Sequence, residues 1–379
     1  HKYNDFTWNN KTADFRSPNA SATDAGYSST VIGREEGGRK GHHISEVRVT
    51  DNSGARYVYG IPAYNTYQEE VTFSVNAGGQ SNVQTGLIDY EKNVDDTKDN
   101  AKGLDNYYNK VVTPGYAHSY LLTTVLSADY VDRDNIPGPS DGDLGTYTKF
   151  NYVRVMEKFK WRTPFSLKGG EGSYSQGMIS KDSDDKANYV YGEKEVWYLH
   201  SIETRTHVAE FHLKDREDAR GVVDRHGKIG SEKQKCIDKI VLYSKPDKLN
   251  SAAEPIKTVH FDYDYSLCPN TPNSEGGANH GKLTLKKVWF TYGNSQKGVL
   301  NPYIFNYADQ NFDGQMDAEL NPTYDFKNYD RWGNYKKDNT SGLSNAEFPY
   351  STQDKDEADK NSAVYALSGI QTPTGGNLR

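Results

Sequence analysis

The sequence predicts an all-β fold of antiparallel strands with few short helices. Only 34% of the 379 residues are apolar, yet 12% are aromatic and 29 of them are Tyr. Disordered chains are poor in aromatic residues, so a polar chain with this composition is expected to fold. Tyr favours strands, because its ring covers a half-buried face while its hydroxyl stays in water. The 34 Gly indicate many turns, so we expect multiple antiparallel sheets, as a β-sandwich or a β-meander.

The first clear element is a hairpin near the N-terminus. Residues 44–50 alternate apolar and polar side chains, and residues 56–61 form a second strand-like segment. Between them lies Asp51-Asn-Ser-Gly54, whose Asn and Gly tolerate the backbone conformations of a tight turn. The spacing therefore predicts two paired strands.

The same reasoning assigns the rest of the chain. Strand-like segments follow at 70–75, 117–127, 147–155, 158–162, 189–191, 195–202, 207–213, 237–243, 256–265, 282–292 and 303–307. Residues 88–110 are either a short helix or a loop, and Asp354–Leu367 has the pattern of an amphipathic helix with acids at its start. Residues 166–187 are rich in Gly, Ser and Asp. We place a boundary there, between an N-terminal β-rich region (1–165) and a second β-rich region (166–379).

The charge and the ends of the chain exclude some classes of protein. The net charge of -7 argues against a nucleic-acid partner, because phosphate binding needs a basic surface. No apolar stretch reaches the roughly 18 residues that suggest a membrane-spanning helix, so we expect no membrane insertion. A chain that runs from His1 to Arg379 without an initiator Met is expected to be a piece of a longer protein.

The two cysteines, Cys236 and Cys268, flank two strand-like segments, 237–243 and 256–265. If those segments pair antiparallel, both thiols lie at the open end of one ribbon. A disulfide there would close a loop of roughly 30 residues and contribute about 3 kcal/mol. The alternative is a pair of unbonded, half-buried thiols.

Several segments carry a family resemblance. Residues 282–292 are followed by Asn301-Pro-Tyr-Ile-Phe-Asn-Tyr307, and Tyr329-Asp-Arg-Trp-Gly-Asn334 contains a Tyr-Asp-x-x-Gly-Asn core. These segments, with Arg56-Tyr-Val-Tyr-Gly60, resemble the Rhs/YD-repeat superfamily, in particular large surface or secreted proteins of Bacteroidetes-type bacteria. The resemblance implies β-ribbons, a structural role and a location on the bacterial outer surface or outside the cell. It implies partners in other parts of the same large protein or among cell-surface components.

One motif has the spacing of a calcium loop. Oxygen ligands at positions one, three, five and nine and Gly314 at position six match an EF-hand or dockerin-type loop, with a backbone carbonyl at position seven. The candidate ligands are Asp309, Asn311, Asp313, Gln315 and Asp317. Position twelve holds Leu320, and Glu319 stands one place early. We therefore expect a structural Ca²⁺ here, or else a polar turn.

Other candidate groups have weaker patterns. A second acidic group contains Asp132, Asp134, Asp141 and Asp143 and lacks regular spacing. His207 and His212 are five residues apart, so a regular strand would point them to opposite faces. We interpret Glu193 and Glu195 as a solvated strand face. Arg216, Arg220 and Arg225 lie in a charged segment that suits an anion contact or a salt-bridged loop.

No spacing in the sequence defines a catalytic residue. There is no Gly-x-Ser-x-Gly elbow, no His-Glu-x-x-His and no Gly-rich phosphate loop. We therefore favour a non-enzymatic structural or interaction segment of a large secreted or cell-surface protein. One alternative is a carbohydrate-binding module with an exposed aromatic row that includes Trp197, Trp289 or Trp332. Another is a glycoside hydrolase domain with two close carboxylates.

Overall fold

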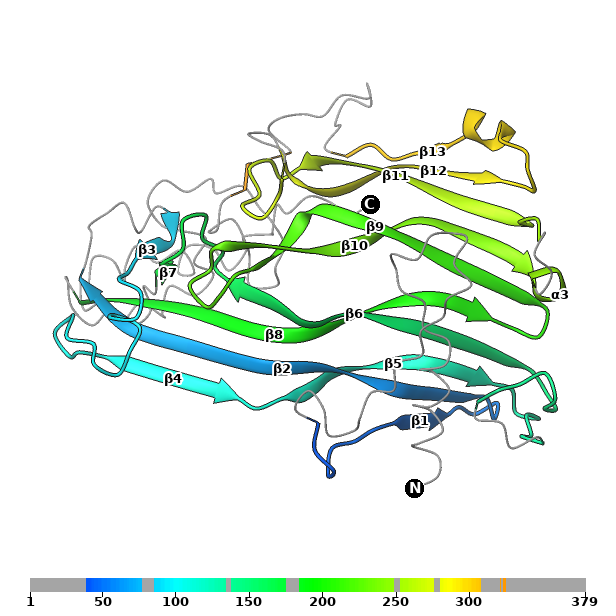
Figure 1. The fold of residues 1–379 in the computed structure, drawn as a ribbon, viewed down its shortest axis with the longest axis horizontal. Coiled ribbons are helices and arrows are strands. Elements are labelled where there is room, and N and C mark those ends of the chain that lie inside the picture. Colours follow the sequence, from blue (N-terminus) through cyan, green and yellow to red (C-terminus); the bar gives the residue numbers. More distant parts are fainter. Residues whose placement is uncertain are drawn as a thin grey trace, which may run out of the picture.

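The computed structural model describes residues 39–76, 85–133, 138–174, 184–248, 253–275, 280–307, 321 and 323–324. These residues confirm the all-β prediction. Their strands form one 13-stranded sheet, with antiparallel pairing throughout (Figure 1). Helices in the same ranges are short, namely α3 (Lys245–Lys248) and η3 (Lys297–Leu300). No helix in this part of the chain has the length and apolarity needed to cross a membrane.

The strands are long and follow one another across the sheet. They are β1 (Val47–Thr50), β2 (Arg56–Asn76), β3 (Leu87–Asp89), β4 (Tyr108–Thr113), β5 (Tyr116–Leu126), β6 (Tyr147–Thr163), β7 (Glu171–Tyr174), β8 (Asp184–Glu203), β9 (His207–Val222), β10 (Ile229–Ser244), β11 (Lys257–Leu267), β12 (Lys282–Thr291) and β13 (Tyr303–Ile304). Their order is β1-β2-β5-β6-β8-β9-β10-β11-β12-β13, while β4 pairs with β2 and β7 links β3 to β8. Neighbours in sequence are mostly neighbours in the sheet, as in a meander.

The predicted β1–β2 hairpin is confirmed. The amide of Gly54 donates to the carbonyl of Asp51 at 3.0 Å, and Gly54 has a φ of 83°, a conformation that Gly adopts without strain. The Asp51 carboxylate accepts from the amides of Ser53 and Ala55. These bonds fix the turn that sets the register of the two strands.

Several segments predicted as separate strands are continuous. β2 joins the predicted segments 56–61 and 70–75, and β8 joins 189–191 and 195–202. The interruptions in the apolar–polar alternation correspond to register shifts inside one strand, for example between Asn65 and Tyr67 of β2. A bulge breaks the period of two without ending the strand. The strands predicted from the apolar–polar alternation are therefore shorter than the observed β2 and β8.

β2 loses one neighbour along its length. One edge of β2 pairs with β5 from Arg56 to Asn65 and with β4 from Gln68 to Phe73, and the other edge pairs with β8 from Asn65 to Asn76. In Figure 1, β2 runs beside β5 at one end of the sheet and beside β8 at the other. Asn65 pairs with both Tyr116 of β5 and Lys194 of β8, so these two strands lie on opposite edges of β2. We call the point at Asn65, where β8 separates from β2, the fork.

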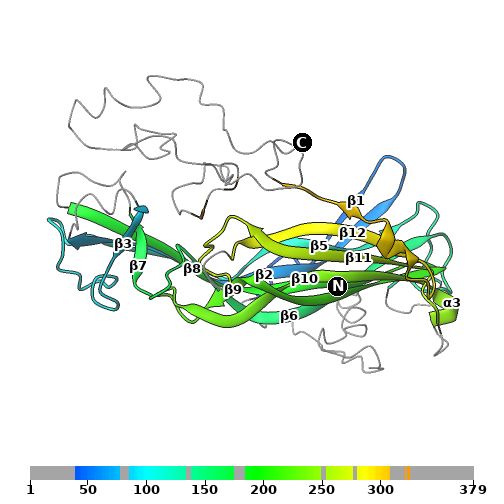
Figure 2. The ribbon, with the colours of Figure 1, turned by 90° about the horizontal axis from the view of Figure 1, so that it is seen from above.

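The apolar core lies at the end of the sheet where β8 begins. There β3, β7 and the loop that follows β3 pack on the sheet. Figure 2 shows β3 and β7 at one end of the long sheet. The buried cluster consists of Val71, Phe73, Val75, Ile88, Tyr90, Ala187, Tyr189, Tyr191 and Val222. We call the sheet surface that carries Phe73 and Tyr189 the core face. Burying rings of this size stabilises the packed layers by about 1.5–3 kcal/mol each.

The expected boundary near residue 165 falls inside one sheet. β6, from the first region, pairs with β8, from the second, between Lys149–Glu203 and Thr163–Val190. Residues 88–110 contain β3, turns and the start of β4, so the loop alternative is the one observed. The predicted helix at 354–367 lies outside the described residues.

The expected disulfide is wrong in the structure. Cys236 and Cys268 are both buried, and they are not joined. β10 and β11 do pair antiparallel, with Lys239 opposite His260. The β10–β11 pairs end at Lys239 and His260, and Cys268 follows the end of β11 in a turn conformation with a φ of 55°. The alternative of two unbonded thiols is therefore the one observed.

Candidate functional site

The fork holds a buried carboxylate. This carboxylate belongs to Glu195 of β8. Its neighbour Lys194 pairs with Asn65 of β2 and with Phe159 of β6, whereas Val196 pairs with Met156 of β6. Glu195 therefore lies at a register shift between β6 and β8. The Glu195 side chain is 1% exposed. It lies at the place where β8 separates from β2, and a strand that loses a neighbour has backbone groups without their usual ladder bonds.

The Glu195 carboxylate supplies the missing contacts. One oxygen accepts from the amide of Tyr64 at 3.1 Å and from the indole nitrogen of Trp197 at 3.1 Å. The carboxylate also forms ion pairs with Arg39 at 2.7 Å and Arg154 at 3.0 Å. Burial alone would raise the pKa of Glu195, but these hydrogen bonds and the positive charge of Arg39 hold it below its ordinary value.

Aromatic rings complete this cluster. The guanidinium of Arg39 lies 4.5 Å from the centre of the Tyr64 ring, and the Tyr64 hydroxyl is 2.9 Å from Nδ1 of His43. Arg154 lies 5.9 Å from the Trp197 ring. Our interpretation of Glu195 as part of a solvated face was wrong. The alternation along β8 runs unbroken from Tyr189 to Glu195 and puts Glu195 on the core face, and period-two counting cannot tell which face of a strand is covered.

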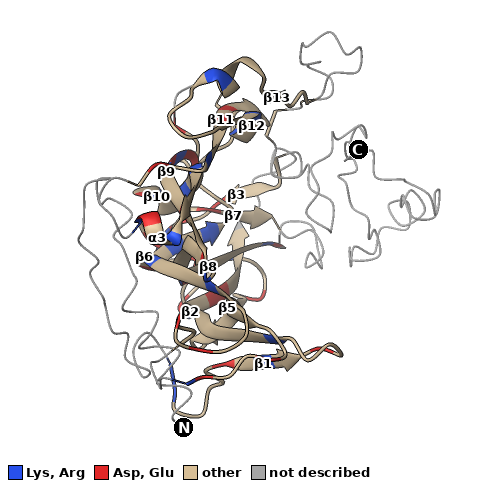
Figure 3. Ribbon diagram, turned by 90° about the vertical axis from the view of Figure 1, so that its right-hand side faces the viewer, with Lys and Arg blue, Asp and Glu red and all other residues tan. Residues whose placement is uncertain are grey.

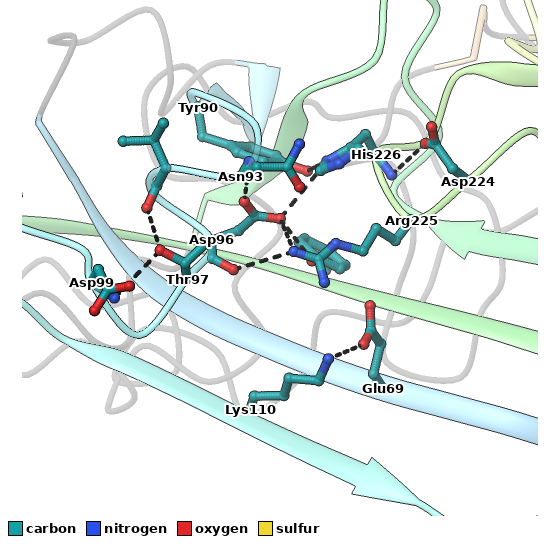
Figure 4. A network of polar contacts seen from close by, with 12 residues as sticks. Glu69, Tyr90, Asn93, Asp96, Thr97, Asp99, Lys110, Asp224, Arg225 and His226 are labelled. Carbon is teal, nitrogen blue, oxygen red and sulfur yellow. Dashed lines mark hydrogen bonds and ion pairs between the residues drawn. The ribbon is translucent and has the colours of Figure 1, made fainter.

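A second buried cluster centres on Asp96 (Figure 4). The Asp96 carboxylate accepts from the Asn93 amide at 2.6 Å, the Tyr189 hydroxyl at 3.0 Å and Nη2 of Arg225 at 3.0 Å. His226 lies beside it, with Nδ1 at 3.7 Å from the carboxylate. These contacts tie the loop after β3 to β8 and to the β9–β10 turn.

Arg162 of β6 fills the space between these elements. Its guanidinium donates to the carbonyls of Arg225 and Glu171, each at 2.7 Å, and to the Tyr90 hydroxyl at 3.2 Å. It also lies 4.6 Å from the Tyr189 ring centre. Burial lowers the pKa of Arg162 and raises the pKa of Tyr90 to about 12. The carbonyl dipoles and the face of the Tyr189 ring stabilise the positive charge of the Arg162 guanidinium.

The Asp96 cluster is built to hold elements together. Both Asp96 oxygens accept hydrogen bonds, and burial lowers the pKa of His226, which keeps its imidazole neutral near pH 7. A base needs a free lone pair that faces substrate, and Asp96 offers none. Within the described ranges, no group of three His, Cys, Asp or Glu side chains could hold a metal ion.

The predicted calcium ligands, Asp309 to Asp317, lie outside the described residues. The described residues on either side of them are attached to the sheet. β13 pairs with β12 before the motif. After it, Asn321 accepts from the amide of Cys268 and donates to the carbonyl of Ser266, each at 2.8 Å.

The second acidic group is occupied by protein donors. Asp143 accepts from the Tyr130 hydroxyl at 2.7 Å and from the amides of Arg133 and Ser140. Asp141 accepts from the Tyr147 hydroxyl at 2.7 Å and from Lys245 at 3.0 Å. Asp134 lies outside the described residues. Donors directed at these oxygens leave Asp141 and Asp143 poorly suited to a cation.

The three arginines of the charged segment are paired with acids. Arg216 makes a two-pronged contact with Asp218, at 2.9 and 2.8 Å. Arg220 contacts Glu275 at 3.2 Å, and Arg225 contacts Asp96. Figure 3 shows basic and acidic residues interspersed over the described ribbon. Of the two interpretations, the structure has the salt-bridged one. His207 and His212 pair with Ser244 and Lys239 along β10.

The expected aromatic row is not assembled from the residues we named. Trp197 donates to the buried Glu195, whereas Trp289 stacks on His260 with ring centres 5.0 Å apart. Trp332 lies outside the described residues. Sequence reasoning missed Glu195 and Asp96, because their partners lie far away in the chain.

The described residues define an all-β protein with one antiparallel sheet, on which two buried carboxylates fasten neighbouring elements. In comparisons with protein-family models, with curated proteins and with solved structures, nothing matches this chain. The fold class is therefore established by the structure itself, and function must be argued from the contacts.

We expect Glu195→Gln to destabilise the protein by about 3–5 kcal/mol, because Arg39 would remain buried without its acid. Because the pKa of Glu195 is lower in the folded chain, its stabilisation is present above the ordinary value of 4.5 and is lost as pH falls through the folded pKa. Urea unfolding at several pH values should show the gap between the proteins shrinking below that pH. Glu157→Gln, at the exposed acid that also contacts Arg154, is the control, with an expected cost below about 1 kcal/mol. Equal effects of the two changes would contradict this role.

Asp96→Asn should weaken the attachment of the loop after β3, because Arg225 loses its ion pair and the Tyr189 hydroxyl loses a charged acceptor. Removing one partner from a buried pair costs about 3–5 kcal/mol. Amide hydrogen exchange should rise at residues 91–100 before it rises in β10. Asp99→Asn, at an exposed carboxylate in the same loop, should leave both segments unchanged. Uniform acceleration across the sheet would argue against a local fastening.

Proposed function

We propose that this chain is a non-enzymatic structural or interaction segment of a large secreted or cell-surface bacterial protein of the Rhs/YD-repeat kind. The observation that carries the proposal is the use of its buried charges. Glu195 and Asp96 bind protein groups that come from three or more elements each. Side chains engaged in this way hold a fold together and are not available to a substrate.

The shape of the sheet supports the same proposal. Its strands reach 21 residues in β2 and 20 in β8, well above the usual five or six. Long antiparallel strands with many cross-strand contacts resist local opening. Such a sheet suits a shell or stalk segment that must keep its form outside a cell.

One end of the sheet is suited to contact with other parts of the same protein or with cell-surface components. β13 and the preceding η3 expose apolar side chains, among them Leu300, Tyr303 and Ile304. Large apolar groups in water near an edge strand favour association with another surface.

We propose further that the Asp309–Asp317 motif holds a structural Ca²⁺. Support comes from the ligand spacing and from the attachment of the flanking residues to β12 and to the end of β11. An ion held between two attached ends would stiffen the connection between them.

Removing calcium should lower the melting temperature, because an ion that binds only the folded chain stabilises it in proportion to ln(1 + [Ca²⁺]/Kd). At about 100 times Kd this is roughly 2.7 kcal/mol. Calorimetric titration of the metal-free protein should show one calcium site, and Asp309→Ala with Asp313→Ala should abolish it. Asp262→Ala, at a half-exposed position of β11, is the control. An unchanged melting temperature after chelation would remove the ion from the proposal.

The location can be tested separately. Antibodies raised against folded protein should label intact cells of the source bacterium or recover the protein from the medium. A cytoplasmic marker, stained in the same sample, controls for lysis. Labelling that appears only after the cells are broken open would refute the surface or secreted assignment.

A further inference from the structure

Exposed apolar side chains gather at the outer edge of the sheet, around β13 and η3. In Figure 1 this edge forms the upper border of the sheet, beyond β12. The exposed fractions of these side chains run from 37% for Phe305 to 84% for Leu300. We call the following residues the edge patch: Tyr292, Val299, Leu300, Tyr303, Ile304 and Phe305. Apolar groups gathered in this way mark a docking surface for a protein or for a lipid layer.

The edge patch has apolar side chains on both faces of the sheet. Tyr303 is opposite Val288 of β12, and Ile304 is opposite Lys287. Because successive residues of a strand point to opposite faces, Tyr303 and Ile304 lie on different sides of the edge. Tyr303 contacts Phe290 edge to face, with ring centres 5.9 Å apart. A protein that packed on one face would leave one of the two side chains in water, whereas a lipid layer would surround both.

The backbone of β13 is a poor template for a further strand. β13 has only two residues, and Pro302, which stands just before them, has no N–H to donate. Short edge strands and edge prolines are features that prevent pairing with another chain. Among the described residues, the strand order ends at β13, so no strand lies on its outer side. The edge is therefore unsuited to a second copy of this chain that would extend the sheet.

Lysines flank the edge patch and give it a charged rim. The ammonium group of Lys257 in β11 lies 4.0 Å from the centre of the Phe290 ring and 5.7 Å from that of Tyr292. Lys297, the first residue of η3, is exposed. Over the part of the chain that the structure describes, neither ammonium group forms an ion pair or a hydrogen bond. Both positive charges are thus available to a partner.

The acids near this rim have partners within the protein. Asp262 and Asp264 each lie 4.0 Å from a lysine of β12, Lys287 and Lys286 respectively. Glu254 accepts from the side-chain nitrogen of Asn294 at 2.7 Å. Lys257 and Lys297 therefore keep uncompensated positive charge beside exposed Leu, Ile and Tyr side chains. Apolar and aromatic groups with neighbouring lysines are the combination that binds the surface of an anionic lipid layer.

We propose that the edge patch binds the surface of a lipid layer that contains anionic lipids. Leu300, Tyr303 and Ile304 enter the boundary between headgroups and acyl chains, while Lys257 and Lys297 contact lipid phosphates. The backbone edge stays at the level of the headgroups, where water satisfies its N–H and C=O groups. The protein lies on the layer and does not span it. This inference names the cell-surface component of the proposed function and rests on that proposal.

The probe is a vesicle of phosphatidylcholine with about one third phosphatidylglycerol, and the full chain should float with it in a density gradient. Leu300→Asp should weaken this binding by at least about tenfold, because it removes an inserted apolar group and adds a repelled charge. Leu167→Asp is the matched control at another exposed leucine, 69% exposed, in the loop after β6, and should bind like the parent chain. Both variants should keep the parent melting temperature, because neither leucine is buried.

The lysines are tested with the same vesicles. Lys257→Gln and Lys297→Gln should each weaken binding by about fivefold, the factor expected for one lysine near an anionic surface. Neither change should alter binding to vesicles of phosphatidylcholine alone. Lys158→Gln, at an exposed lysine of β6, should have no effect on either kind of vesicle.

Several results would overturn the proposal. These are no binding of the parent chain to the anionic vesicles, equal binding of the parent and Leu300→Asp, or equal losses for Leu300→Asp and Leu167→Asp. A dimer of the parent chain that Leu300→Asp abolishes, seen by analytical ultracentrifugation, would assign the edge patch to a second copy instead. Surface labelling of cells tests the proposed function separately. Labelled intact cells without vesicle binding would remove only the lipid contact, and vesicle binding with labelling only of broken cells would remove only the location.

Discussion

The structure depends on a fork in one sheet, at which β8 separates from one edge of β2. Pairing of β2 with β8 ends at Asn65 and Lys194, while the other edge of β2 stays paired with β4 and then β5. A sheet cannot split in this way without leaving backbone groups unpaired. The Glu195 carboxylate accepts the Tyr64 amide at the split, and Arg39 and Arg154 compensate its charge. One buried acid therefore satisfies the edge of β2 that β8 leaves.

The Asp96 cluster performs a related task at the end of the sheet where the apolar core lies. There a loop, rather than a strand, must be held against β8, and a loop has few backbone bonds to offer. Asp96 replaces them with contacts to Tyr189 and Arg225, while Arg162 donates to the carbonyls of Arg225 and of Glu171 in β7. Both clusters thus use desolvated charge where regular pairing is interrupted. This common logic explains why a chain with so few apolar residues still builds a stable interior.

The two surfaces of the sheet at the fork differ in how their charges are compensated. On the core face the charges of Glu195 and its arginines are compensated within the protein. On the other side, Lys194 has no acid and Asn65 keeps an unused oxygen. Ordinary strand alternation produces both results, because Lys194 and Glu195 are successive residues of β8 and face opposite sides of the sheet.

By itself, the sequence determined the fold class, most strand positions and the β1–β2 and β10–β11 pairings, because alternation and turn residues are local properties of the chain. The tertiary structure decided what bulges and distant partners control: the length of β2 and β8, the burial of Glu195 and the unbonded state of Cys236 and Cys268. A bulge reverses the facing of every later side chain in its strand, and no local pattern records where it falls. For the same reason Asp96 resembled its solvated neighbours in sequence, and only the fold brought Arg225 to it across 129 positions.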